Sequence, residues 1–163
     1  MSAEMTADIN SGVRDVRPPA IVVRILNPLM RALLGSRLGR RMQNVALIEF
    51  SGRRSGRAYR IPVGWHHVGG QAIVVTPAAW RANFADGRAA TVHQGGLGQS
   101  MTGTLVTNEA EVARALQAML DAGTPPRQLG LRIPSGHRVL SSDVSAVNRA
   151  IIRFEPSFPR RIA

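Results

Sequence analysis

A β-hairpin is predicted at the segment Phe50-Ser-Gly-Arg-Arg-Ser-Gly-Arg-Ala-Tyr-Arg-Ile-Pro62. An apolar run over residues 45–48 leads into the segment, and residues 61–65 lead out of it. Gly52 and Gly56 bracket three polar residues between the two runs, and glycine permits the positive φ angles that tight turns need. The segment therefore predicts two strands joined by a basic turn.

The residues of this turn suit an anion site. Arg53 and Arg54 carry planar guanidinium groups that match phosphate or carboxylate oxygens, and Ser55 adds a hydroxyl donor. Backbone N–H groups of a glycine turn can also face a ligand. Basic turns are also common as plain solvated turns, so the pattern by itself leaves both interpretations open.

Length and composition exclude several function classes. The chain has 163 residues, enough for one well-buried core and too few for two ordinary domains. It has no cysteine, which excludes disulfides, thiolate metal sites and a cysteine nucleophile. All 21 basic residues are arginines, so a Walker lysine and a lysine Schiff base are excluded too. The net charge of +11 favours an anionic ligand, a polyanion or a membrane surface as partner.

The N-terminal part predicts a lead-in followed by a helix. We expect a flexible lead-in over residues 1–19 and a single domain over residues 20–163. Apolar residues recur at three- and four-residue spacing from 20 to 35, with arginines on another side, which indicates an amphipathic helix. Such a basic helix covers its own protein's core in most cases, but it can also lie on a membrane surface. We therefore expect a cytoplasmic protein with peripheral membrane contact through residues 20–41 as one option.

The rest of the chain alternates strand and turn patterns. Gly69-Gly70 is a strong two-residue hairpin signal, and Pro62 belongs at a sheet edge or bulge because it cannot donate to a ladder. Asn108 is the expected N-cap of a helix that buries Val112, Leu116 and Met119. Strands are expected at residues 45–50, 59–68, 71–76, 89–94, 100–107 and 150–154, and short helices at 79–86 and 143–148.

Two motifs resemble one known family. Gly52-Arg-Arg-Ser-Gly-Arg-x-Tyr-Arg-x-Pro62 resembles the signature of the deazaflavin (F420)-dependent nitroreductases, small split β-barrels related to flavin-mononucleotide-binding barrels. Trp80-Arg-Ala-Asn-Phe84 is similar to the family's segment that opens a short helix beside the cofactor. The resemblance covers roughly residues 27–155 in element order. It implies an α+β fold, with about six mostly antiparallel strands in a split β-barrel and flanking helices.

The resemblance also implies a cofactor, coenzyme F420, with flavin mononucleotide (FMN) as the alternative, and no metal. Positions 53–56 and 60 match those that hold the anionic tail, and positions 61–63, 75 and 76 match those along the ring. Trp80 would pack on the ring and Asn83 would donate to an oxygen; no catalytic residue is assigned. The cofactor-binding residues so implied are Arg53, Arg54, Ser55, Gly56, Arg60, Ile61, Pro62, Val63, Val75, Thr76, Trp80 and Asn83.

The implied activity is hydride transfer from reduced F420 to an apolar acceptor such as a quinone. The sequence departs from the well-studied nitroreductases, because the loop before Trp80 is very short and lacks the family's lysine. It also has a single tyrosine, Tyr59, inside the hairpin motif, whereas those enzymes line the substrate site with several tyrosines. These departures argue against nitroreductase activity. The alternative function is a non-catalytic split barrel that binds a lipid, a fatty acid or a flavin. Oligomeric state is left open.

Histidines and the second glycine run give weaker signals. His66 and His67 are adjacent on an expected strand, so they point to opposite faces, and one of them is a candidate proton donor. His93 and His137 have no metal-ligand spacing around them. Residues 95–98 are glycine-rich but contain no lysine and open no helix, which favours a hairpin tip over a phosphate loop.

Two other functions fit the residues poorly. Ser135-Gly-His137 has an aspartate nearby at position 143, but no nucleophile elbow surrounds any serine, so a serine hydrolase is poorly supported. The charge fits nucleic-acid binding, yet aromatic residues make up only 4% of the chain, so stacking platforms are scarce. Nucleic acid is therefore not an expected partner.

Overall fold

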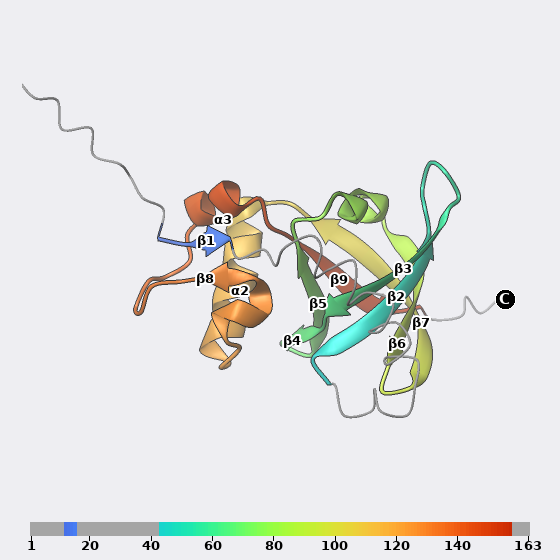
Figure 1. The fold of residues 1–163 in the computed structure, drawn as a ribbon, viewed down its shortest axis with the longest axis horizontal. Helices are drawn as coiled ribbons and strands as arrows, with labels where there is room; N and C mark the ends of the chain where they lie inside the picture. Colours follow the sequence, from blue (N-terminus) through green and yellow to red (C-terminus); the bar gives the residue numbers. More distant parts are fainter. Residues whose placement is uncertain (1–11, 16–42, 158–163) are drawn as a thin grey trace, which may run out of the picture.

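The computed structural model describes residues 12–15 and 43–157, and Figure 1 shows their arrangement. The helix expected over 20–35 and the membrane contact expected through 20–41 lie outside these residues and stay predictions. The main element is a seven-stranded antiparallel sheet with the order β3-β2-β6-β7-β9-β5-β4. Its strands are β2 (Val45–Ser51), β3 (Ala58–Gly64), β4 (His66–Val68), β5 (Gln71–Thr76), β6 (Arg88–Gln94), β7 (Leu97–Val106) and β9 (Ala150–Pro156).

The order of the strands requires the sheet to curl. Its two edge strands, β3 and β4, are consecutive in the chain and are joined by Trp65 alone. A single residue spans less than 4 Å, so the two edges must lie next to each other, and the sheet closes into a split β-barrel. The predicted α+β split barrel is thus confirmed. Pro62 lies in the edge strand β3, as its missing N–H predicts.

The strands differ from those predicted in two main ways. Residues 59–68 form two strands, because the chain leaves one edge of the barrel at Gly64 and enters the other at His66. This bend gives the sheet seven strands where about six were predicted. The other difference is the β6–β7 hairpin, where Gln94 faces Leu97, so the turn is Gly95-Gly96 and Gly98 lies inside β7.

The two α-helices of the described residues, α2 (Glu109–Asp121) and α3 (Ser141–Val147), lie together on one side of the barrel (Figure 1). The 3₁₀ helix η3 (Pro126–Leu129) follows α2 along the chain. Asn108 caps α2 as predicted, since its Oδ1 accepts a hydrogen bond from the Glu111 N–H at 3.0 Å. None of the helices within 12–15 and 43–157 is long and apolar enough to cross a membrane.

Part of the predicted lead-in belongs to the folded domain. Arg14–Asp15 forms strand β1, which pairs antiparallel with β8 (Leu131–Arg132) beside the helices. Val13 is buried in the core under α2. The prediction of a flexible lead-in over residues 1–19 is therefore wrong for residues 12–15, where apolar burial and strand pairing fix the chain.

The described residues form two hydrophobic cores, one on each face of β5 and β9. The core under the helices is aliphatic and contains residues such as Ile73, Leu116 and Ile151. The core inside the barrel is rich in aromatic residues and includes Phe84 and Phe154. Side chains alternate along a strand, so β5 and β9 supply both cores and are covered on both faces. The barrel core borders the site described next.

Candidate anion-binding site

The tip of the β2–β3 hairpin is a compact loop closed by its own backbone. The Gly52 N–H donates to the Arg57 carbonyl at 2.7 Å, and the Gly56 N–H donates to the Gly52 carbonyl at 3.0 Å. Gly52 is buried, and a Cβ there would lie 2.8 Å from Ser55 Oγ and 3.0 Å from the Tyr59 ring. The loop therefore requires glycine at position 52 because of space. Gly56 is exposed at the tip with φ of 66°, a conformation that glycine adopts without strain.

A short helix holds this tip from the side. The 3₁₀ helix η2 (Ala79–Phe84) follows β5. Within it, the Asn83 side chain makes two hydrogen bonds, accepting from the Arg53 N–H at 2.8 Å and donating to the Trp80 carbonyl at 2.8 Å. The two sequence motifs, 30 residues apart, are thus joined by a direct contact. The side-chain oxygen of Asn83 thus fixes the tip of the β2–β3 hairpin, residues 52–57, called the arginine loop below.

A pocket of about 450 Å³ lies where the loop and η2 meet. Arg53 is partly neutralised there, because its NH1 lies 2.9 Å from Asp86 Oδ2. Arg54 is exposed and has no hydrogen bond or ion pair within the described part of the chain. Arg54 is therefore the cation most available to an anionic ligand. The lining residues are Arg53, Arg54, Ser55, Tyr59, Ala82, Asn83 and Ala85.

Aromatic packing supports one wall of this pocket. Tyr59, which lines it, stacks on Phe50 with ring centroids 5.0 Å apart and planes 5° apart. Trp80 is half-buried against Phe50 and Phe84, at centroid distances of 6.0 and 6.1 Å. Trp80 is not among the lining residues, so its indole anchors η2 to the barrel core. Offset aromatic contacts of this kind favour a fixed ring geometry.

Arg60, the third arginine assigned to the cofactor tail, lies on the other face of the hairpin. Glu49 faces Arg60 in the β2–β3 register, one position from the pair of Phe50 and Tyr59, which point into the barrel. Arg60 Nε lies 2.7 Å from Glu49 Oε1. The structure therefore does not bring Arg60 to the pocket with Arg54. Glu49 Oε2 also lies 3.2 Å from His93 Nε2, out of line for a hydrogen bond.

The residues assigned to the cofactor ring are also not in this pocket. Ile61 and Val63 pack in the barrel core, and Pro62 lies in the same edge strand. Val75 packs toward the helices. Thr76 is buried, and its Oγ1 accepts a hydrogen bond from the Ala78 N–H at 3.1 Å, which shapes the turn into η2.

The two adjacent histidines face opposite sides of β4. His66 is in register with Ile73 of the aliphatic core, whereas His67 is in register with Ala72 of the aromatic core. Burial lowers the pKa of His66 below its usual value of 6.5, and the neighbouring His67 lowers it further. Neither histidine lines the pocket. No proton donor is thus placed beside Arg54 by this pair.

His137 and Asp143 form a pair that closes a helix end. His137 Nε2 lies 2.8 Å from Asp143 Oδ2, and the same oxygen accepts a hydrogen bond from the Leu140 N–H at 2.9 Å. Asp143 is buried at the start of α3, where a carboxylate stabilises the free N–H groups. Within the described ranges no serine donates to His137, so the pair serves structure. The same ranges contain no group of three potential metal ligands.

Sequence reasoning missed Tyr59 as a residue that lines the pocket and Asp86 as the partner of Arg53. Asp86 pairs with Arg53 and thereby leaves Arg54 as the open cation. Its signal was its place three residues after Asn83, the spacing of one further turn of a short helix. Tyr59 was noted as the single tyrosine of the chain, but its stacking on Phe50 depends on the strand register.

Comparisons with known proteins give similarity of shape alone. No protein-family model and no curated protein matches the chain. One similar solved structure is the FAD and heme binding protein from Mycobacterium smegmatis, with 14% identity, 90% of this chain and 69% of that chain covered, and a TM-score of 0.42. HutZ, the heme storage protein from Vibrio cholerae, has 11% identity, coverages of 81% and 90%, and a TM-score of 0.44.

A third similar structure is a pyridoxamine 5′-phosphate oxidase-related, FMN binding protein from Nostoc punctiforme. Its identity is 11%, 79% of each chain is covered, and the TM-score is 0.44. These similarities assign no ligand and no activity to this chain. The candidate site is supported by the contacts of this chain's own residues.

Proposed function

We propose that this protein binds an anionic redox cofactor, coenzyme F420 in the first place, between the β2–β3 tip and η2. The observation that carries the proposal is the 2.8 Å hydrogen bond from the Arg53 N–H to Asn83 Oδ1, which joins the two cofactor motifs. Beside it stands Arg54, which has no acidic partner within the described residues. Guanidinium groups of this kind bind phosphate and carboxylate oxygens in charge-assisted pairs.

The pocket residues fit the anionic part of such a cofactor. Arg54 supplies the open charge, the Ser55 hydroxyl can donate, and Tyr59 and the alanines supply apolar surface. The volume of about 450 Å³ falls in the range of small-molecule sites. The lining residues include no histidine and no carboxylate that could activate Ser55 as a nucleophile. Reaction chemistry would therefore come from the cofactor, and F420 supplies hydride transfer when bound.

In this proposal the protein orients the cofactor and excludes water, and the acceptor is an apolar molecule such as a quinone. Arg54 and Ser55 hold the anionic tail, and the aromatic wall at Tyr59 keeps one side of the pocket apolar. Peripheral membrane contact through residues 20–41 would bring the protein to such an acceptor, and it remains a proposal. FMN is the alternative cofactor.

A second candidate function is a split barrel that binds its ligand without turnover. It is favoured by the placement of positions 61–63, 75 and 76, which pack in the two cores or in the edge strand and do not line the pocket. A ring held along those positions would need another surface. A bound lipid or flavin without hydride transfer would meet this arrangement.

The test is fluorescence titration of the purified protein with oxidised F420, with FMN titrated in parallel. We expect F420 to bind at micromolar concentration. Arg54→Ala should then weaken binding about tenfold, the lower end for hydrogen bonds to charged groups, because this arginine is exposed to solvent. Reduced F420 with a quinone then distinguishes an enzyme from a binding protein by whether turnover occurs.

Arg132→Ala is the matched control, since Arg132 is also an exposed arginine and lies on the helical side of the protein. It should leave F420 affinity unchanged. Equal losses in both variants would show that binding follows net charge alone. An unchanged affinity in Arg54→Ala would remove the site from the hairpin.

A further inference from the structure

Arg81 of η2 forms hydrogen bonds with Asn148, which lies between α3 and β9. Asn148 ends α3 in the left-handed conformation, with φ of 49° and ψ of 42°, and it is the only non-glycine residue of the described ranges with a positive φ. Arg81 donates to it twice, from NH1 to the Asn148 carbonyl at 2.8 Å and from NH2 to Oδ1 at 2.9 Å. Its NH1 also donates to the Thr76 carbonyl at 3.2 Å.

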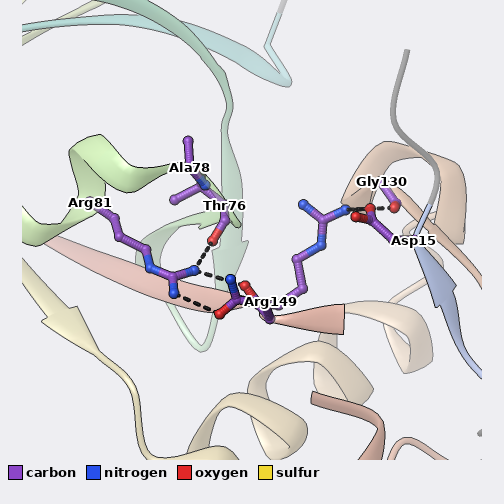
Figure 2. Close-up of polar contacts among 7 residues, drawn as sticks. Asp15, Thr76, Ala78, Arg81, Gly130 and Arg149 are labelled. Carbon is purple, nitrogen blue, oxygen red and sulfur yellow. Dashed lines mark hydrogen bonds and ion pairs between the residues drawn. The ribbon is translucent and has the colours of Figure 1, made fainter. Parts of the chain in front are cut away.

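One guanidinium group therefore ties together the end of β5, the start of β9 and η2. Figure 2 shows Arg81 reaching this junction from one side, while Arg149 extends to the other side toward Gly130 and Asp15. Arg149 is buried and donates to the Gly130 carbonyl at 2.8 Å. The Asn148–Arg149 backbone is thus anchored in both directions, which makes it a rigid support for Arg81.

The identity of residue 148 indicates a purpose beyond ending a helix. Glycine is the usual residue in the left-handed position after a helix, and asparagine is the common exception. Here asparagine adds the Oδ1 acceptor, which together with the backbone carbonyl matches the two-pronged donor geometry of a guanidinium group. Glycine would end α3 equally well but would leave Arg81 with fewer acceptors.

The hydrogen bonds of Arg81 to Asn148 form a clasp, and the helix η2 connects this clasp to the candidate site. Arg81 lies between Trp80, which packs on Phe50, and Asn83, which holds the Arg53 N–H. Six residues of 3₁₀ helix have weak hydrogen bonds of their own, so side-chain anchors decide where η2 lies. Arg81 supplies the anchor on the side of β9, and Trp80 supplies the one on the side of the barrel core.

We infer that Arg81 is a positioning residue for the anion site, acting through η2 and Asn83 on the arginine loop. Arg81 does not line the pocket, so it contacts no ligand there. Its effect is to keep Asn83 Oδ1 at the Arg53 N–H, which fixes the loop that carries Arg54. The inference rests on the proposed function for its consequence in binding, but its structural part can be tested without a ligand.

The direct readout is the exchange of the Arg53 amide hydrogen with solvent, followed by NMR. We expect Arg81→Gln to raise this exchange rate about tenfold, because loss of a charge-assisted hydrogen-bonded clasp frees η2. Arg81→Lys should give an intermediate rate, since an ammonium group cannot reach both acceptors in the planar fork geometry. Amides in the β2–β6 ladder, such as Ile48, should keep their rates.

Asn148→Gly is a variant that keeps the fold, because glycine accepts the left-handed conformation and retains the carbonyl acceptor. It should raise Arg53 exchange only two- to threefold, as a single neutral acceptor is lost. Arg114→Gln, which removes the same charge from an exposed position on α2, is the matched control and should change nothing. Unchanged Arg53 exchange in both Arg81→Gln and Asn148→Gly would overturn the inference.

Titration with oxidised F420 gives the second readout. Arg81→Gln should weaken F420 binding about five- to tenfold, less than or equal to the loss in Arg54→Ala. If the wild-type protein binds neither F420 nor FMN, the proposed function fails, whereas the Arg53 exchange rate still decides the role of Arg81. If Arg81→Gln lowers only the melting temperature and leaves exchange and affinity unchanged, Arg81 is a structural residue alone.

Discussion

Two of the glycine-containing hairpin tips of the barrel, β2–β3 and β6–β7, look alike in sequence and differ in structure. The β6–β7 tip is Gly95-Gly96 with φ angles of 60° and 81°, a two-residue turn followed by Leu97, which is 74% exposed. The β2–β3 tip contains a buried glycine, closes on itself and is held by η2 through Asn83. Glycine content alone does not distinguish the two tips. The contact with a second element, η2, does.

The largest effect is expected from removing the support of η2. Phe84 is fully buried and packs against Phe50 and Phe154, so Phe84→Ala should cost about 3–5 kcal/mol of unfolding free energy. Leu97→Ala on the exposed β6–β7 tip should change it by less than about 0.5 kcal/mol. Urea denaturation followed by circular dichroism measures both. A cost in Phe84→Ala below that of Leu97→Ala would remove the distinction between the tips.

An intermediate effect is expected from adding a methyl group to each tip. Gly52→Ala must displace Ser55 or Tyr59 and should cost about 1–3 kcal/mol. Gly96→Ala meets the strain of a positive φ and should cost about 1–2 kcal/mol. The two substitutions should thus lower the unfolding free energy by similar amounts. The affinity for oxidised F420 should distinguish the two variants. It should fall in Gly52→Ala and stay the same in Gly96→Ala; a fall in both would place the ligand elsewhere.

The smallest effect is expected from His66, which lies in neither tip. Its lowered pKa means that the folded state favours the neutral ring, while the unfolded chain takes up a proton below pH 6.5. This contribution to stability is present above pH 6.5 and is lost as the pH falls through the pKa of the folded state. His66→Gln should remove that part of the pH dependence, measured as the urea midpoint at several pH values.

His67→Gln should retain most of this dependence, because burial of His66 is the larger cause of the lowered pKa and His67 the smaller. Binding at the β2–β3 tip should not follow the titration in either variant, since neither histidine lines the pocket. An equal loss of pH dependence in His66→Gln and His67→Gln would show that this dependence comes from repulsion between the two imidazole rings.

Local features of the fold were predictable from the sequence. The hairpin at Gly69-Gly70, the cap at Asn108 and the edge position of Pro62 each depend on the chemistry of one or two residues. The split at Trp65 was not predictable in this way. Residues 59–68 contain an isolated Gly64 but no two-residue hairpin signal, so the pattern predicts one continuous strand. The order of strands depends on pairing across the whole chain.

Four of the seven residues that line the candidate site were predicted from the sequence, and their contacts were not. Arg53, Arg54, Ser55 and Asn83 meet in one pocket, as expected from the two motifs taken together. The pairing of Arg60 with Glu49 follows from the strand register, which a one-residue shift would reverse. The clasp of Arg81 on Asn148 joins residues 67 positions apart and left no local pattern to find.

The place of β9 in the sheet has a consequence for the synthesis of the chain on the ribosome. β9 comes last of the strands along the chain, yet it lies between β7 and β5 and joins the two halves of the barrel. Domains are made from the N-terminus. The edge of β5 that pairs with β9 therefore stays unpaired, with only β4 on its other side, while about 75 further residues are synthesised. Its open edge is exposed to other nascent chains during that time. The barrel therefore closes only after β9 has been made, and a chain stopped before residue 150 would present two unjoined sheets.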